Sequence, residues 1–168
     1  DAMIAGLTLN IFNNHADRVH MANLAQTVNV LQAVILTEGE KMILTPTYHV
    51  MNMYKVHQDA LLLPTKIENN PDYGNVPAIS VSASKDNNGR TYISLVNIDI
   101  KKDYEVTINV DNLKPRSATI LSSEKIQDYN TFENPNKISP KEFKDYKSKK
   151  NQITLDIPAF SVVVFEAN

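Results

Sequence analysis

The spacing of hydrophobic and polar residues along the chain changes near Asp59. In residues 1–58, hydrophobic side chains recur mostly every three or four positions, which is the period of a helix with one buried face. In residues 59–168 they recur every second position, in short segments separated by Asn, Asp, Gly and Pro, which is typical of strands on a core. We therefore expect a mainly β chain with two domains of these bounds, an α/β N-terminal region and an antiparallel, jelly-roll-like β-sandwich.

Two helices are predicted in the first region. Residues 1–14 carry apolar side chains at helical spacing, and Asn13-Asn14-His15 is a polar stop. Thr45 offers a hydroxyl at the N-cap and Pro46 a ring at the first helical position, so a second helix is expected to begin there. Its apolar stripe runs to about Gln58.

A short strand and a polar turn are predicted between these helices. The strand covers Val19–Ala25, and Gln26–Leu31 forms the turn at its carboxyl end. A second apolar piece at 33–36 leads into a loop over 37–41. Helix, strand, polar loop and helix follow one another in this order in the last part of an α/β barrel or of a doubly wound sheet.

Gln26 is the candidate binding residue of the turn. A polar side chain just past the carboxyl end of a barrel strand points into the mouth of the active site. The alternative is structural, with Gln26 and Asn29 only satisfying backbone groups of the turn. The residue pattern leaves both interpretations open.

The second region is predicted to form strands joined by turns and one long excursion. Asp86–Gly89 ends in an Asn-Gly pair, a strong hairpin signal. Segment 124–151 is longer than the about 15 residues of an ordinary connection, so we expect an excursion with its own packing. The side chains expected to hold it are Phe132, Ile138, Phe143 and Tyr146. The nearly continuous Val and Phe of 160–165 suit a central strand. The other period-two strands are 79–83, 93–95, 106–110 and 153–157.

Composition narrows the possible classes of protein. With 42% hydrophobic and 21% charged residues, the sequence is that of a globular protein rather than a disordered one. A net charge of −2 gives no reason to expect a nucleic acid or an anionic membrane as a partner. The absence of cysteine excludes disulfides and thiolate chemistry. No apolar run approaches the about 20 residues that span a bilayer, and composition does not assign a compartment.

The sequence contains none of the common catalytic, phosphate-binding or metal-binding motifs. The basic run at 141–150 is interrupted by acidic residues and is typical of a solvated face. There is no Gly-x-Ser-x-Gly elbow, and the four glycines are too dispersed to cradle a phosphate. We expect no cofactor and no metal site, because no metal-ligand spacing relates the four histidines His15, His20, His49 and His57.

Several runs are specific enough to carry a family resemblance. In the first region they are Gly6–Asn10, His15–Val19, Met21–Leu31 and Leu44–Val50. In the second region they are Asn130–Pro135, Ile138–Pro140 and the strand pair of 155–165. Over essentially its whole length the chain resembles the α-L-arabinofuranosidases of glycoside hydrolase family 51, with residues 1–58 matching the end of the catalytic domain.

The resemblance implies a (β/α)₈ barrel followed by a C-terminal β-sandwich. Such enzymes release terminal α-L-arabinofuranosyl groups from arabinan, arabinoxylan and related oligosaccharides with retention of configuration. Retention uses two carboxyl groups about 5–5.5 Å apart, one as nucleophile and one as acid/base. In the family these are glutamates of Asn-Glu and Asp-Glu-Trp motifs, and this sequence contains neither. Only the glutamine after the last barrel strand carries over, onto Gln26, with the expected role of binding the furanose or holding the nucleophile.

We therefore expect a C-terminal fragment of an α-L-arabinofuranosidase that has no catalytic residue of its own and is inactive alone. In the family the sandwich is completed by strands that precede the barrel, so a homo-oligomer formed through exposed edges and apolar faces is expected for the isolated chain. The alternative is a non-catalytic carbohydrate-binding or structural β-sandwich. Against sugar binding, the strands offer only Tyr73, Tyr92 and Tyr104 as aromatic contacts and no Trp.

Overall fold

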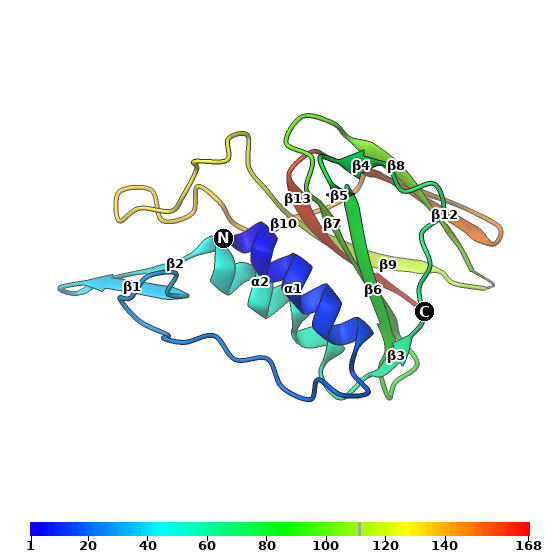
Figure 1. Cartoon of the computed structure of the whole chain (residues 1–168), viewed down its shortest axis with the longest axis horizontal. Coiled ribbons are helices and arrows are strands. Elements are labelled where there is room, and N and C mark those ends of the chain that lie inside the picture. The colour runs from blue at the N-terminus through cyan, green and yellow to red at the C-terminus, as the bar shows by residue number, and fades with distance from the viewer. Residues whose placement is uncertain (111) are drawn as a thin grey trace.

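The chain folds into three layers (Figure 1). A computed structural model describes residues 1–110 and 112–168. A six-stranded sheet forms the middle layer, two helices cover one of its faces, and a three-stranded sheet covers the other. The pairings between named strands in these residues are all antiparallel. The prediction of a mainly β chain built on an antiparallel sandwich is confirmed.

Six strands form the middle sheet: β3 (Leu61–Leu63), β6 (Ile79–Lys85), β7 (Thr91–Asn97), β9 (Pro115–Ser122), β10 (Lys141–Glu142) and β13 (Ser161–Ala167). Their order is β10-β9-β13-β7-β6-β3, so β13 is a central strand, as its run of Val and Phe predicted. The hairpin predicted at Asp86–Gly89 joins β6 to β7. Gly89 has a φ of +83°, a conformation that favours glycine.

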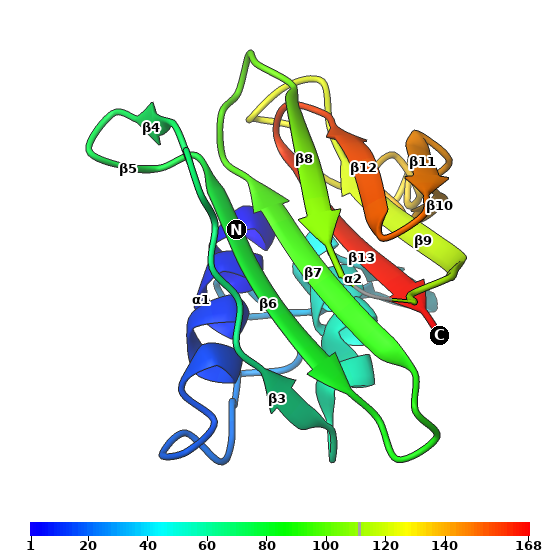
Figure 2. The same ribbon diagram turned by 90° about the vertical axis from the view of Figure 1, so that its right-hand side faces the viewer.

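The second sheet of the sandwich contains three strands, β8 (Tyr104–Asn109), β11 (Tyr146–Lys149) and β12 (Gln152–Ile157), in the order β11-β12-β8 (Figure 2). Alternate residues of the two sheets meet in one core, in which Leu95 and Phe165 pack with Leu155. The Tyr146 and Phe165 rings meet edge-on, with centroids 5.3 Å apart. The core forms because period-two strands place all their apolar side chains on one face.

Two helices, α1 (Ala2–Asn14) and α2 (Pro46–Tyr54), cover the other face of the middle sheet, and a 3₁₀ turn, η1 (Lys55–His57), continues α2. Both helices were predicted, and the Thr45 hydroxyl caps α2 by accepting the Tyr48 backbone N–H at 3.4 Å. In the described parts of the chain, neither helix has the length and apolar character needed to cross a membrane. The apolar side chains buried between the helices and the sheet are Val50, Met53, Tyr54, Val96, Leu121, Val162 and Val164.

Serines of β6 and β7 make the rest of this helix-facing contact polar. The Asn10 side chain is fully buried; its Nδ2 donates to Ser80 Oγ at 3.1 Å. Its Oδ1 accepts from Ser82 Oγ at 2.8 Å and from the Tyr54 hydroxyl at 2.9 Å. Asn10 therefore links both helices to β6.

His57 makes a second polar link between the helix layer and the sheet. Its Nδ1 lies 2.7 Å from Ser84 Oγ and its Nε2 lies 2.6 Å from Ser94 Oγ. Burial lowers the pKa of His57 to about 4, so the ring is neutral near pH 7. A neutral imidazole has one donor and one acceptor, and the two serine hydroxyls can supply the complement of each.

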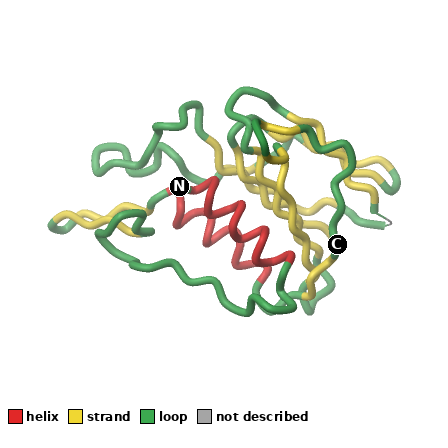
Figure 3. The backbone as a smooth tube through the Cα atoms, in the orientation of Figure 1, coloured by secondary structure: helices red, strands yellow, loops and turns green. Residues whose placement is uncertain are grey.

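The prediction of a strand at Val19–Ala25 is wrong. Residues 15–34 pass the helices without regular structure (Figure 3), apart from an isolated parallel bridge between Val28 and Ile35. A strand requires a neighbour whose backbone groups pair with its N–H and C=O groups. Among the described residues, no strand lies beside 19–25 to provide them.

The hairpin β1 (Ile35–Glu38) and β2 (Lys41–Leu44) projects from the helix layer (Figure 1). We predicted an apolar piece at 33–36 and a loop over 37–41. The strand instead covers Ile35–Glu38, and the loop is reduced to residues 39–40. Thr37 and Glu38 belong to the ladder because they pair with Met42 and Lys41. A smaller hairpin is formed by β4 (Asp72–Tyr73) and β5 (Val76–Pro77).

The long segment 124–151 contacts both cores through Ile138, Phe143 and Tyr146, whereas Phe132, the fourth side chain expected to hold it, is half-buried and belongs to neither core. Ile138 is buried in the cluster beneath the helices, and Phe143 is buried in the sandwich core. The helices thus share buried contacts with the sheet rather than standing apart from it. The proposed division of the chain at residue 58 stays a prediction.

Candidate functional site

Gln26 is exposed and lies within the irregular segment 15–34, nine residues before the β1–β2 hairpin begins at Ile35. The peptide bond between Ala25 and Gln26 is cis. The Gln26 side chain forms no hydrogen bond with the described residues. The structural interpretation required this side chain to satisfy backbone groups of the turn, and it does not do so. The binding role of Gln26 stays a prediction.

The residues directly after Gln26 are attached to the hairpin. The Thr27 carbonyl accepts the Ile35 N–H at 3.1 Å, and the Asn29 N–H donates to the Ile35 carbonyl at 3.1 Å. The Asn29 side chain adds two bonds: Oδ1 accepts the Thr37 N–H at 2.7 Å, and Nδ2 donates to Thr37 Oγ1 at 2.8 Å. Asn29 thus satisfies a backbone group of β1 rather than one of the turn in which it lies.

The base of the hairpin is attached to both layers behind it. The Thr45 N–H and hydroxyl both donate to the Val34 carbonyl, at 3.0 and 3.2 Å. Asn130, which is buried, donates to the Leu44 carbonyl at 2.9 Å and pairs with the backbone of Ile138. Asn130 begins one of the runs that carry the family resemblance, but its contact with Leu44 could not be predicted, because it spans 86 residues and no local pattern signals it.

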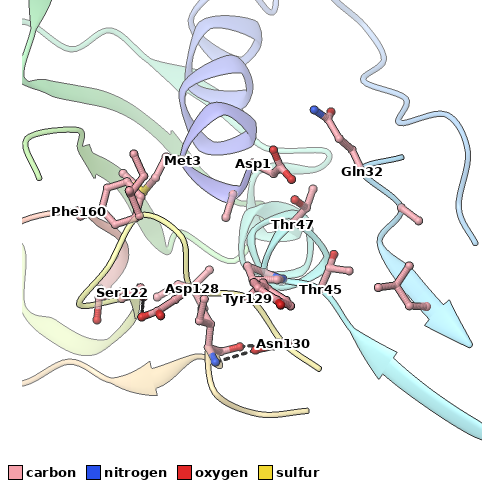
Figure 4. Close-up of a pocket in the computed structure, with 18 of the residues that line it drawn as sticks. Asp1, Met3, Gln32, Thr45, Thr47, Ser122, Asp128, Tyr129, Asn130 and Phe160 are labelled. Carbon is pink, nitrogen blue, oxygen red and sulfur yellow. Dashed lines mark hydrogen bonds between the residues drawn. The ribbon is translucent and has the colours of Figure 1, made fainter. Parts of the chain in front are cut away.

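A cavity of about 320 Å³ opens beside this segment (Figure 4). It lies between the first residues of the two helices, residues 30–33 and the loop that follows β9. Gln26 is not among its lining residues. Asp128 at its rim is paired with Lys137 Nζ at 2.6 Å and accepts the Ser123 hydroxyl, and these contacts hold the pKa of its carboxyl below the ordinary value. This carboxylate is therefore ionised at neutral pH.

The glutamates of this region do not have the properties of a glycosidase acid. Glu38 and Glu40 lie at the exposed tip of the hairpin. Hydrogen bonds from its own backbone N–H and from Thr131 lower the pKa of Glu133, which is also exposed. A general acid has to retain its proton near neutral pH, so a lowered pKa is opposite to what that role needs.

The four histidines do not come together. His49 is buried on α2, burial lowers its pKa, and its Nε2 has no hydrogen-bond partner among the described residues. His57 is held by two serines, whereas His15 and His20 are exposed. In residues 1–110 and 112–168, no group of three or more His, Cys, Asp or Glu side chains is placed to hold a metal ion.

The tyrosines of the strands do not form an exposed aromatic surface. Tyr92 is buried, and Tyr73 and Tyr104 are half-buried. The Tyr104 hydroxyl donates to Asp99 Oδ2 at 3.0 Å, and the Lys102 ammonium lies 5.1 Å from the centre of its ring. Because Tyr92 is buried and the Tyr104 ring is held by Asp99 and Lys102, these residues do not form an exposed flat face for a sugar.

The fold is thus that of an antiparallel β-sandwich module with a two-helix layer and a loop-bearing hairpin on one side. The family model of the α-L-arabinofuranosidase C-terminal domain matches residues 1–161, and the chain belongs to this family. The resemblance inferred from the sequence motifs is confirmed.

Two relatives with assigned activities match nearly the whole chain. An intracellular exo-α-L-arabinofuranosidase from Bacteroides ovatus is 45% identical over 172 residues, which cover 99% of this chain and 34% of that protein. An intracellular exo-α-(1→5)-L-arabinofuranosidase from Bifidobacterium longum is 25% identical over 180 residues, which cover 99% and 32%. The chain therefore spans about a third of the length of these relatives.

Solved structures agree with this assignment. The family 51 (GH51) arabinofuranosidase from Xanthomonas axonopodis pv. citri superposes with a TM-score of 0.94 at 41% identity, covering 100% of this chain and 35% of that one. The α-L-arabinofuranosidase from Thermotoga maritima, solved as an arabinose complex, gives 0.85 at 25% identity, covering 99% and 37%. These matches include the helix layer and the hairpin, because they extend over the whole chain.

Proposed function

We propose that this chain is the C-terminal part of an α-L-arabinofuranosidase that hydrolyses terminal non-reducing α-L-arabinofuranosyl groups with retention of configuration. The observation that carries the proposal is 45% identity over 99% of the chain to an exo-α-L-arabinofuranosidase of which it covers 34%. Arabinose-containing oligosaccharides and polysaccharides are the corresponding substrates.

Both catalytic carboxyl groups are proposed to lie outside these residues. The chain has neither an Asn-Glu nor an Asp-Glu-Trp sequence. A retaining mechanism needs one carboxylate as nucleophile and a second, protonated carboxyl group as acid. The exposed Glu38 and Glu40 and the low-pKa Glu133 suit neither role. The chain alone is therefore proposed to be inactive.

Gln26 is proposed to be the residue of this chain that contacts the sugar or the nucleophile. Its side-chain amide is exposed and has no partner among the described residues, so both its donor and its acceptor are available. The sandwich and the helix layer would act as a scaffold, because Asn130 and Thr45 attach the hairpin beside Gln26 to both layers.

The test is hydrolysis of an aryl α-L-arabinofuranoside by this chain and by a protein in which it is extended upstream to the length of its relatives. Activity in the longer protein alone is expected. Turnover by the short chain would overturn the placement of the carboxylates. If neither protein hydrolyses the substrate and the short chain binds to arabinan, the result would favour a carbohydrate-binding module instead.

Self-association of the isolated chain is a further part of the proposal. Large hydrophobic side chains are exposed on the outer side of residues 1–58, and β3 ends the middle sheet with Leu61 exposed. We expect a dimer or larger species in light scattering at tens of micromolar, and a monodisperse monomer would contradict this. The exposed side chains are Ile4, Ile11, Met21, Leu24, Val28, Leu31 and Met42.

A further inference from the structure

We propose that Asn29 is a positioning residue for Gln26: through its paired hydrogen bonds to Thr37, it holds the Gln26 loop against the β1–β2 hairpin. The inference rests on the proposed function, because it assigns Gln26 to the sugar site. The observation that carries it is the four-bond attachment of Thr27–Asn29 to β1, which begins one residue after Gln26.

The Asn29 side chain provides the half of this attachment that the backbone cannot. Thr27–Asn29 makes two backbone bonds to Ile35 and then turns away, so the Thr37 N–H has no backbone acceptor on that side. Asn29 Oδ1 accepts this N–H at 2.7 Å, and Nδ2 binds the Thr37 hydroxyl at 2.8 Å. An amide is the side chain that accepts and donates in parallel at this length.

The backbone of Asn29 also suits this residue type. Its φ is +54°, in the left-handed region that asparagine tolerates better than most side chains. A substitution by glycine would keep this conformation available and remove only the side chain. Asn29→Gly therefore separates loss of the two hydrogen bonds from loss of the backbone conformation.

The hairpin can serve as the reference for Gln26 because it is itself held in place. Its base is bound to the start of α2 through Thr45 and to the sandwich loop through buried Asn130. Gln26 has no other contact of this kind, since its own side chain forms no hydrogen bond with the described residues. Without the Asn29–Thr37 pair, the residues that flank Gln26 would keep only two backbone bonds to β1.

The experiment measures kcat/KM on an aryl α-L-arabinofuranoside in the protein that is extended upstream. It also measures amide hydrogen exchange at Ile35, both in that protein and in the present chain. Asn29→Gly is expected to lower kcat/KM at least about ten-fold, because a small misplacement of a binding group costs up to about a hundred-fold. Exchange at Ile35, whose N–H binds the Thr27 carbonyl, is expected to accelerate. Asn69→Gly is the matched control, since Asn69 is also exposed and has a φ of +56°.

Two further variants distinguish positioning from a merely structural role. Asn29→Asp keeps the acceptor for the Thr37 N–H and can accept the Thr37 hydroxyl, so it should restore most of kcat/KM. In a Gln26→Ala background, Asn29→Gly should have almost no additional effect on kcat/KM, because the residue through which it acts is absent. A structural role would instead give the same loss in both backgrounds and a lower melting temperature.

Each remaining outcome has one meaning. Wild-type kcat/KM in Asn29→Gly, full additivity with Gln26→Ala, or no effect of Gln26→Ala itself would overturn the positioning role of Asn29. An unsubstituted longer protein without activity would count against the proposed function, and exchange at Ile35 would then report separately whether Asn29 holds the loop. Unchanged exchange at Ile35 in Asn29→Gly would overturn the attachment as well.

Discussion

The two faces of the middle sheet are packed by different forces. The face toward the three-stranded sheet is almost wholly apolar, with Leu95 and Phe165 buried against Leu155. The face toward the helices combines an apolar centre with hydrogen bonds from Asn10 and His57 to serines. Apolar burial stabilises without fixing a direction, whereas hydrogen bonds fix which side chains meet.

The two layers that cover the middle sheet also differ in the segments attached to them. The three-stranded sheet closes the sandwich, and any well-packed apolar set of the right volume would do so. The helix layer supports the segment with Gln26 and the hairpin, so its position relative to the sheet has to be defined. The buried serines of β6 fix the position of the helix layer through their hydrogen bonds to Asn10 and His57. Loss of these hydrogen bonds should therefore lower stability through unpaired polar groups, whereas loss of a core side chain lowers it through a cavity.

The largest expected effect is on the apolar face. Phe165→Ala removes a fully buried ring and leaves a cavity, so we expect the free energy of unfolding to fall by about 3–5 kcal/mol. Urea denaturation followed by far-UV circular dichroism measures the change. Leu61→Ala is the control, because Leu61 is 71% exposed and should change stability by less than about 0.5 kcal/mol. Similar values for the two variants would contradict this account of the core.

The helix face should respond to pH, because the half-buried His57 ring lies between Ser84 and Ser94. Its pKa is about 4 in the folded chain and close to the ordinary histidine value of 6.5 in the unfolded one. Between these values only the unfolded chain takes up a proton, so the stability present above pH 6.5 is lost as the pH falls toward 4. From pH 7 to 4.5, wild type should lose about 2–3 kcal/mol more than His57→Gln. Equal losses would show that this ring does not titrate as described.

The smallest of the three effects concerns Asn10. Asn10→Ala leaves the Ser80, Ser82 and Tyr54 hydroxyls without their buried partner, which costs about 2 kcal/mol of unfolding free energy. Asn14 lies one turn further along α1 and donates to the Val81 carbonyl from an exposed position, so Asn14→Ala should cost less than about 1 kcal/mol. Equal costs would mean that the buried network gives no more than a surface hydrogen bond.

The local pattern was sufficient for both helices and for most of the sandwich. Period-two segments became β6, β7, β8 and β12, and the nearly continuous Val and Phe run became β13, because each carries its buried side chains in its own sequence. Thr45 and Pro46 marked the start of α2 for the same reason: a cap acts within one turn. The family also followed from local runs of residues, and the comparisons confirm it.

Contacts between distant residues were decided only by the tertiary structure. Val19–Ala25 has the composition of a strand but no neighbour among the described residues, so it stays irregular. Asn130 reaches Leu44 across 86 residues, and His57 reaches Ser84 and Ser94 on two different strands. A hydrogen bond depends on where the fold brings its partner, and that position is not encoded in the spacing of neighbouring residues. Gln26 could be named from the sequence, but the attachment that holds its loop could not.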